Sequence, residues 1–279
     1  MKLQSNSNTN AHEPIILLTN DDGIDSPGIW AAARELNQIG KVIIAAPSSQ
    51  QSGTGRGLNG KGTDGTIRKE NRVFHGQQFD VYSINATPAQ VILHVILEIL
   101  PHKPDLSVSG INYGENLSMD ITNSGTVGAA LEAASYGILS LAISTETVDN
   151  IWFDYSDKVD FSVSAYFARF FGTMLLQKIM PEDVLLLNVN VPRAATRQTP
   201  WHAARLSPNH YYQPFIQRNG DWDSPASISA TTDIFENEQP GTDIYVTKVD
   251  HHVSVTPISL DLTSRVVLDS FEASLKEAG

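Results

Sequence analysis

Asp21 and Asp22 are adjacent carboxylates that lie one residue after a short, mostly apolar run, Ile15 to Thr19, and directly before Gly23. The run is apolar without alternation, which predicts a fully buried strand. In an open α/β sheet, ligands bind just beyond the carboxyl ends of the strands. Two adjacent carboxylates repel each other, and a bound cation normally offsets that cost. A solvated Asp-Gly turn is the simpler alternative, but the strand before the pair and the helix signal after it favour a metal site.

Two other polar residues fall where they could join this pair. Asn112 follows a predicted strand at 105–110, and the glycines around it permit a sharp turn. Its carbonyl oxygen could complete the shell of a hard cation, although asparagine is also an ordinary turn residue. Ser52 and Gly53 lie in a long polar connection at 48–76, and such connections are often functional. This connection is either a flexible loop or a segment that turns back over the acidic pair.

The stretch Ser124, Gly125 and Thr126 opens a predicted helix whose apolar spacing begins at Val127 and which Gly137 ends. Its small polar residues leave the first backbone N–H groups of the helix open to an anion. Helix N-termini bind phosphate through these N–H groups and the helix dipole. A plainly capped helix would have a similar sequence, so this stretch indicates a phosphate site only together with the acidic pair.

Alternating strands and helices must position these residues. The helix after Gly23 has Ser26 as its expected cap and Pro27 in its first turn, and Gly40 is expected to end it. Strand, helix, strand in so short a space is a right-handed crossover, which implies a parallel sheet. The predicted strands are 15–19, 41–47, 79–84, 105–110, 138–144 and 183–191, and the later helices are 87–100, 124–137 and 156–179.

The chain is expected to fall into three parts: a disordered polar tail at 1–13, a catalytic core at 14–192, and a β-rich extension with a C-terminal arm at 193–279. Within the last part, 244–249 and 252–255 are predicted as short strands. His94 and Glu98 lie one turn apart on a predicted helix, where a surface hydrogen-bonded pair is favoured over a metal site.

Composition limits the function further. The 279 residues carry 31 acidic and 19 basic side chains, a net charge of −12, which argues against binding a nucleic-acid polymer. A mononucleotide is not excluded, because a metal ion and a helix N-terminus can hold one phosphate. The chain has no cysteine, which excludes disulfides, thiolate catalysis and zinc–thiolate sites. The longest apolar stretch, 91–100, is too short to span a bilayer, and we expect a cytoplasmic protein without a membrane partner.

Taken together, the motifs resemble those of the SurE family, the survival-protein E or 5′/3′-nucleotidase family. The residues that carry the resemblance follow one another along most of the chain: Thr19-Asn20-Asp21-Asp22-Gly23, Pro27-Gly28, Ala46-Pro47, Gln50-Gln51-Ser52-Gly53, Ser109-Gly110-Ile111-Asn112, Gly114, Asn116-Leu117, Asp120, Ser124-Gly125-Thr126-Val127-Gly128-Ala129-Ala130, Leu187-Asn188-Val189-Asn190-Val191-Pro192 and Val253-Ser254-Val255-Thr256-Pro257.

The resemblance implies an α/β fold, a Rossmann-like, doubly wound, mostly parallel sheet with a β-rich C-terminal oligomerisation extension. It implies a divalent-metal phosphomonoesterase that converts nucleoside monophosphates to nucleoside and phosphate. It also implies homodimers or homotetramers in which C-terminal arms are exchanged. The positions that match the family's metal ligands are Asp21, Asp22, Ser52 and Asn112, an oxygen-only set that suits one Mg²⁺ or Mn²⁺ ion.

We therefore expect two groups of site residues. The catalytic group is Asp21, Asp22, Asn112, Asp120 and Ser124, in which Asp22 or Asp120 orients the water or protonates the leaving oxygen. The phosphate-binding group is Asn20, Gly53, Ser124, Gly125 and Thr126.

Two other protein classes share part of this pattern. A phosphate-signalling receiver domain, which binds without hydrolysing, also has an acidic pair after its first strand. It needs a later phosphoacceptor aspartate, where this chain has Asn112, and a lysine after the last strand, but no lysine closely follows Ser144. A nicotinamide-dependent dehydrogenase needs its glycine fingerprint where Asp21 and Asp22 stand.

Overall fold

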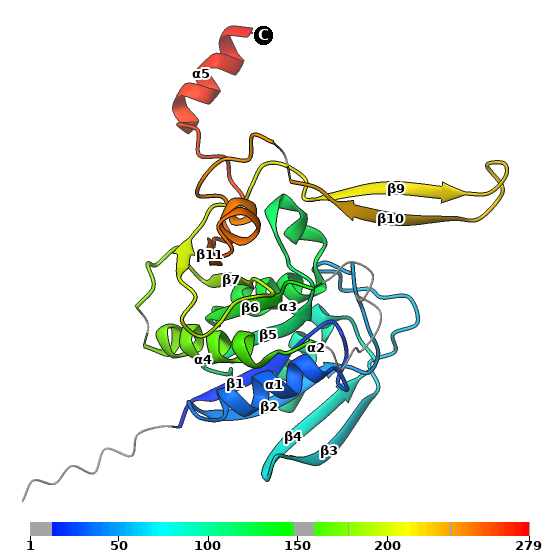
Figure 1. The fold of residues 1–279 in the computed structure, drawn as a ribbon, viewed down its shortest axis with the longest axis vertical. Coiled ribbons are helices and arrows are strands. Elements are labelled where there is room, and N and C mark those ends of the chain that lie inside the picture. Colours follow the sequence, from blue (N-terminus) through cyan, green and yellow to red (C-terminus); the bar gives the residue numbers. More distant parts are fainter. Residues whose placement is uncertain (1–12, 148–158, 178, 235, 279) are drawn as a thin grey trace, which may run out of the picture.

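A nine-stranded sheet forms the centre of the molecule (Figure 1). The computed structural model describes residues 13–147, 159–177, 179–234 and 236–278. Across the sheet the strands follow the order β3 (Ile67–Phe74), β4 (Gln77–Ile84), β2 (Lys41–Pro47), β1 (Ile15–Thr19), β5 (Leu106–Tyr113), β6 (Ser140–Thr145), β7 (Leu186–Val191), β11 (Val253–Ile258) and β8 (Trp201–Ala203).

The predicted mostly parallel sheet is confirmed. β1 pairs in parallel with β2 on one side and β5 on the other, while β6 and β7 continue the parallel run. From Ile16 to Thr19 the residues of β1 are fully buried, as expected of a central strand covered on both faces. The carboxyl ends of β1, β2 and β5 therefore meet at one edge of the sheet, and the candidate site residues lie at that edge.

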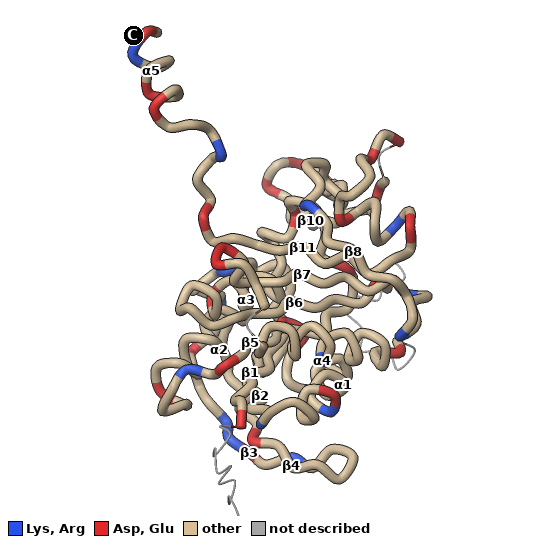
Figure 2. Tube along the Cα trace, turned by 90° about the vertical axis from the view of Figure 1, so that its left-hand side faces the viewer, with Lys and Arg blue, Asp and Glu red and all other residues tan. Residues whose placement is uncertain are grey.

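Helices cover both faces of the sheet (Figure 2). On one face, α1 (Pro27–Leu36) packs beside α4 (Ser162–Leu176), and both bury aliphatic and aromatic side chains against the sheet. On the other face, α2 (Pro88–His94) packs beside α3 (Gly125–Ser135). This two-sided arrangement is the doubly wound layering that the alternation of strands and helices predicts.

Several local predictions need correction. Ser26 occupies the N-cap position of α1, but its hydroxyl makes no capping bond and finds no partner among the described residues. α1 ends at Leu36, before Gly40. The connection at 48–76 is not wholly a loop, because Ile67–Phe74 forms the edge strand β3 in a hairpin with β4. The sequence did not indicate this strand because its side chains are mostly charged or polar. Charged side chains are typical of exposed edge strands.

Other elements agree with the prediction more closely. Thr87 caps α2 in a reciprocal capping box with Gln90, and the helix continues as a π-helical turn at Val95–Ile99. His94 and Glu98 form the expected surface pair. α4 begins at Ser162, later than predicted, and the predicted residues 156–158 lie outside the described ones, as do residues 1–12 of the predicted tail.

β5 runs on to Tyr113, although the sequence predicted a turn after residue 110. The strand register shifts between Ser109 and Asn112. Gly110 is required there, because its φ is +133° and a β-carbon would lie 2.3 Å from the carbonyl oxygen of Ile143. Asn112 consequently stands at the end of a strand and not in a loop.

The sheet continues past Pro192, where the sequence predicts that the core ends. β11 pairs antiparallel with β7 and parallel with the short β8, so both strands belong to the central sheet. The prediction of a strand at 244–249 was wrong, because Tyr245–Val249 forms a π-helical turn. Val246 and Thr247 of this turn are buried, although the turn adds no strand to the sheet.

Two elements of the C-terminal part project from the body in Figure 1. One is the antiparallel hairpin of β9 (Tyr212–Arg218) and β10 (Ala226–Thr232). The other is the helix α5 (Leu268–Ala278), in which no residue is buried. In the part of the chain that the structure describes, no helix combines the length and apolar character needed to cross a membrane.

Candidate active site

Asp21 and Asp22 lie in the turn that directly follows β1, and only 4% and 2% of their surfaces are exposed. Asn20 shapes this turn: its side-chain amide donates to the carbonyl of Gly23 (2.9 Å) and accepts from the N–H of Gly23 (3.1 Å). Gly23 has a φ of +98°, a conformation that favours glycine. The amide of Asn20 is thus engaged in the turn that carries the acidic pair, a different role from the predicted phosphate ligand.

The N-terminus of α3 faces Asp21. The hydroxyl of Thr126 donates to Oδ1 of Asp21 at 2.5 Å. Burial raises the pKa of Asp21 to about 6, against the opposing effect of hydrogen bonds from the hydroxyl and the backbone N–H of Thr126. A carboxylate at a helix N-terminus is stabilised by the helix dipole. The structure therefore brings Asp21 and the predicted phosphate-binding stretch into direct contact.

Asp22 contacts two other segments. Its Oδ2 accepts from the backbone N–H of Tyr113 at the end of β5, and its Oδ1 accepts from the side-chain amide of Gln50, both at 3.3 Å. Burial, followed by the nearby charge of Asp21, raises the pKa of Asp22 well above its ordinary value. Two buried carboxylates side by side are costly, and a divalent cation would offset both the burial and the repulsion.

Ser52 and Asn112 belong to the two segments that donate to Asp22, the loop of Gln50 and the end of β5. Gln50 donates to Oγ of Ser52 (3.1 Å) as well as to Asp22, so the exposed Ser52 hydroxyl lies beside the acidic pair. Asn112 uses its amide nitrogen to donate to the carbonyls of Tyr113 and Gly114. Among the described residues its carbonyl oxygen accepts no hydrogen bond, which leaves that oxygen for another ligand.

The donor chemistry fits a hard divalent cation. Carboxylate, hydroxyl and amide oxygens are the ligands that Mg²⁺ and Mn²⁺ take in proteins. Nowhere in the described ranges do three or more His, Cys, Asp or Glu side chains form a group that could hold a metal ion. The four predicted ligands contain only two acidic residues, so their arrangement agrees with that finding.

The remaining predicted phosphate ligands differ in what they can offer. Ser124 is the N-cap of α3: its Oγ accepts from the N–H of Val127 (3.2 Å), and its hydroxyl proton is left to donate. Gly125 lies so close to Asp21 that a β-carbon there would be 2.8 Å from Oδ2 of that residue. Gly53 is exposed in the loop after Ser52.

Asp120 is directed toward the C-terminal hairpin. Its carboxylate accepts from Nδ1 of His210 (2.7 Å) and from the backbone N–H groups of Tyr211 and Tyr212 (2.9 and 3.1 Å). Ser118 donates to the same carboxylate at 3.1 Å. These bonds make Asp120 an anchor of the hairpin base, a different role from the predicted catalytic one.

Sequence reasoning missed two parts of the site. Gln50 was noted only as a motif residue, although it bridges Asp22 and Ser52. The hydroxyl of Thr126 was also missed, because the stretch was considered only for its backbone N–H groups. A glutamine two residues before a candidate ligand could have indicated a bridge, but nothing in the sequence indicates which way its side chain turns.

Comparison with known proteins agrees with this geometry. The family model described as survival protein SurE matches residues 16–213, which include the acidic pair, Ser52, Asn112 and the start of α3. The chain belongs to the SurE family. SurE nucleotidases are metal-dependent, in keeping with the oxygen donors gathered here.

Relatives and a solved structure resemble this SurE chain over nearly its whole length. The 5′-nucleotidase SurE of Thermococcus gammatolerans is 40% identical over 251 residues, 90% of this chain and 92% of that protein. The 5′-nucleotidase SurE of Methanosarcina barkeri is 36% identical over 273 residues, 94% and 98% of the two chains. The crystal structure of the SurE protein from Aquifex aeolicus matches with a TM-score of 0.71 and 30% identity, covering 94% of this chain and all of that one.

Proposed function

We propose that this SurE chain is a metal-dependent 5′-nucleotidase, which hydrolyses nucleoside 5′-monophosphates to nucleoside and phosphate. The observation that carries the proposal is the contact of a buried carboxylate pair with a helix N-terminus, at Asp21 and Thr126. The carboxylates that would bind a cation then lie next to the helix N–H groups that would bind an anion, so one phosphate group could contact both. Membership of a family whose relatives are named 5′-nucleotidases supports the same activity.

One divalent ion, Mg²⁺ or Mn²⁺, would be held by Asp21, Asp22, Oγ of Ser52 and the carbonyl oxygen of Asn112. When bound, such an ion supplies Lewis-acid polarisation of a phosphoryl oxygen and neutralises developing negative charge. The chain's own residues fix the ligands: Thr126 holds Asp21, while Gln50 joins Asp22 to Ser52.

The phosphate would lie against the start of α3. The hydroxyl of Ser124 and the N–H of Gly125 would donate to its oxygens, and the backbone around exposed Gly53 would approach from the loop side. Asp22, whose carboxylate also reaches the edge of β5, would orient the attacking water. A receiver-like binding domain, the alternative from the sequence, has less support because of the family membership.

Steady-state hydrolysis of adenosine 5′-monophosphate by the purified full chain tests the proposal. Activity should vanish in excess chelator and return with Mg²⁺ or Mn²⁺. Adenosine 3′-monophosphate should be tested beside it, because a preference for the 3′-ester would contradict the 5′ assignment. Full activity after verified metal removal would contradict the metal site.

A homo-oligomer formed through the C-terminal arm is a second part of the proposal. α5 has no buried residue, and Leu268, Phe271 and Leu275 on it are 52–62% exposed. Its charged residues are mostly acidic: Asp269, Glu272 and Glu277 against Lys276. An apolar helix surface of this kind normally packs against a partner.

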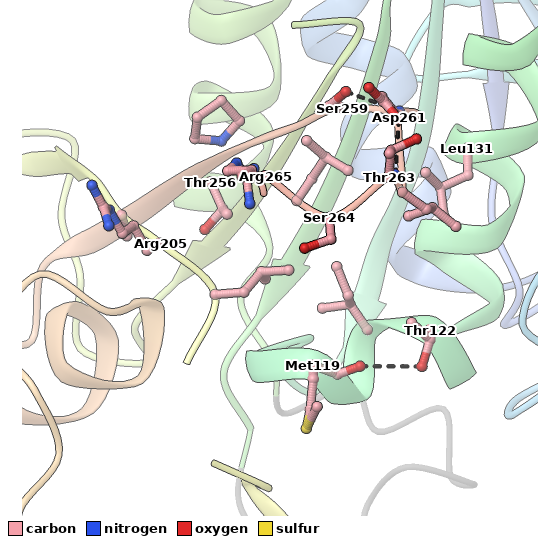
Figure 3. A pocket seen from close by; sticks show the side chains of 16 residues that line it. Met119, Thr122, Leu131, Arg205, Thr256, Ser259, Asp261, Thr263, Ser264 and Arg265 are labelled. Carbon is pink, nitrogen blue, oxygen red and sulfur yellow. Dashed lines mark hydrogen bonds between the residues drawn. The ribbon is translucent and has the colours of Figure 1, made fainter. Parts of the chain in front are cut away.

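The same chain carries a surface suited to such a helix (Figure 3). A cavity of about 950 Å³ lies between the 3₁₀ helix Ser118–Asn123, α3 and the segment after β11, and none of the predicted site residues lines it. Apolar side chains such as Leu131 and Ile258 line it, and its charged lining residues are two arginines and one aspartate: Arg205, Arg265 and Asp261. We propose that this cavity receives the acidic, amphipathic α5 of a second copy.

A further inference from the structure

The loop that carries Ser52 is fixed to α3 well beyond the ligands themselves. We refer to residues 50–58 as the ligand loop. Its Gly55 donates to the carbonyl of Asn123 at 3.0 Å, just before α3 begins. A β-carbon at Gly128 would lie 2.1 Å from the carbonyl oxygen of Gly55, so only glycine at position 128 lets the loop backbone rest on the helix.

An ion pair lies next to this contact. Nε of Arg56 donates to Oε2 of Glu132 at 2.5 Å. Glu132 is four residues after Gly128, so both lie on the same side of α3. Only 3% of Glu132 is exposed. An exposed ion pair contributes little to stability, but removing Arg56 would leave a buried carboxylate without its cation.

The two joined segments are those that hold the two carboxylates. At one end of the ligand loop, the N–H of Gln51 donates to the backbone carbonyl of Asp21 (2.7 Å), and Gln50 bridges Asp22 and Ser52. At the start of α3, Thr126 holds Oδ1 of Asp21. The loop and the helix thus both bond to the acidic pair, and they contact each other at Gly55 and at the Arg56–Glu132 ion pair.

We infer that Arg56 and Glu132 are positioning residues that latch the ligand loop to α3 and so fix Ser52 against Asp21 and Asp22. The inference rests on the proposed function, since it gives the latch the task of holding the metal ligands in place. Neither latch residue is among the proposed metal ligands. Their effect passes through the loop backbone, as partners behind the direct ligands commonly tune metal affinity.

Titration calorimetry of Mn²⁺ into the metal-free full chain tests this inference without using activity. Arg56→Gln and Glu132→Gln should each weaken Mn²⁺ binding about tenfold, as losses behind direct ligands typically do. Arg56→Lys, which keeps the charge, should recover part of the affinity. Hydrogen exchange at residues 50–58 should become faster in the two glutamine variants.

The matched control is Arg169→Gln. Arg169 pairs with the largely buried Glu35 at 2.8 Å, between α4 and α1 on the opposite face of the sheet. This variant should lower thermal stability in the same way, yet leave Mn²⁺ affinity unchanged. If Arg56→Gln and Glu132→Gln bind Mn²⁺ as tightly as Arg169→Gln does, the pair is structural only and the latch is refuted.

The wild-type titration distinguishes failure of the proposed metal site from failure of the latch. A wild-type chain that binds no Mn²⁺ overturns the metal site itself and the latch with it. A wild-type chain that binds Mn²⁺ beside unaffected latch variants overturns the latch alone. If Glu132→Gln does not fold, Arg56→Lys and Arg56→Gln still decide the question, because Arg56 is 44% exposed and its replacement leaves the core of α3 intact.

Discussion

The hydroxyl of Thr126 donates to the carboxylate of Asp21 across 2.5 Å, joining the first turn of α3 to the end of β1. Residues 105 positions apart in the chain thereby fix one orientation of the first acidic ligand. Thr126 is itself fully buried, so its hydrogen bond to Asp21 lies in the protein interior and away from solvent.

Replacing Thr126 with valine removes this bond while keeping the shape of the side chain. We expect the loss to lower metal affinity and kcat/KM by about 10- to 100-fold, as for other groups that orient metal ligands. Thr126→Ser, which keeps the hydroxyl, should restore most of the activity. Equal activity of the valine and wild-type proteins would show that the hydroxyl does not position Asp21.

Gly125 should tolerate no side chain. A β-carbon there would lie 2.8 Å from both Cβ and Oδ2 of Asp21 and 3.1 Å from Oγ1 of Thr54. A side chain at this position would displace Asp21. Gly125→Ala should therefore weaken Mn²⁺ binding and also weaken the inhibition of nucleotide hydrolysis by added inorganic phosphate. Overpacking at this position should lower the free energy of unfolding by about 1–3 kcal/mol. Ser135→Ala, on the same helix, should change neither binding property, and intact Mn²⁺ binding in Gly125→Ala would refute the clash.

Asp120 should contribute to stability in a pH-dependent way. Burial works to raise its pKa, but hydrogen bonds from His210, Tyr212, Ser118 and Tyr211 outweigh it and hold the pKa below the ordinary value of 3.8. Since the folded-state pKa is depressed, the contribution is fully present above the unfolded value and is lost as pH falls through the folded one.

Denaturant unfolding at two pH values tests whether the stabilisation by Asp120 is lost at low pH. At pH 7, Asp120→Asn should be less stable than the wild type by about 2 kcal/mol, the size expected for hydrogen bonds to a charged group. Near pH 3 the difference should shrink. A gap that is constant between the two pH values would mean that the charge of Asp120 does not stabilise the hairpin base.

Ending the chain at Arg265 should break the proposed oligomer without unfolding the protein. This truncation removes α5 and keeps β11, whereas a truncation after Pro192 would remove two strands of the central sheet. Sedimentation velocity should show an oligomer for the full chain and a monomer for the truncated one. Phe271→Asp should act like the truncation, and Ser274→Asp, on the same helix, should do so less. A full-length monomer at micromolar concentration would contradict the arm.

The sequence predicts the parallel core well because its signals are local. Apolar runs such as Ile15–Thr19 and Lys41–Pro47 form strands with the predicted bounds. They are buried on both faces, so hydrophobicity alone identifies them. The acidic pair could be placed for the same reason, because the end of a buried strand fixes its position in the sheet.

The parts of the fold and site that the sequence does not predict depend on contacts between distant segments. β3 has exposed charged residues and pairs only through its hairpin with β4. The sequence predicts a short strand at 252–255, but no local pattern predicts that β11 returns to the central sheet beside β7. The side-chain directions of Gln50, Thr126 and Asp120 were likewise not predictable, since each bonds to a segment at least 28 residues away.

Mn²⁺ titration of the wild type, Asp21→Asn and Asp22→Asn tests the central claim most directly, with circular dichroism confirming that all three are folded. The account predicts one site per wild-type chain. Each asparagine variant should lose binding and adenosine 5′-monophosphate hydrolysis by orders of magnitude, because removing a ligand withdraws several kcal/mol of charge stabilisation. In the metal-free state, each variant should be at least as stable as the wild type, since one buried carboxylate has been removed. Wild-type Mn²⁺ affinity and turnover in both folded variants would contradict the account.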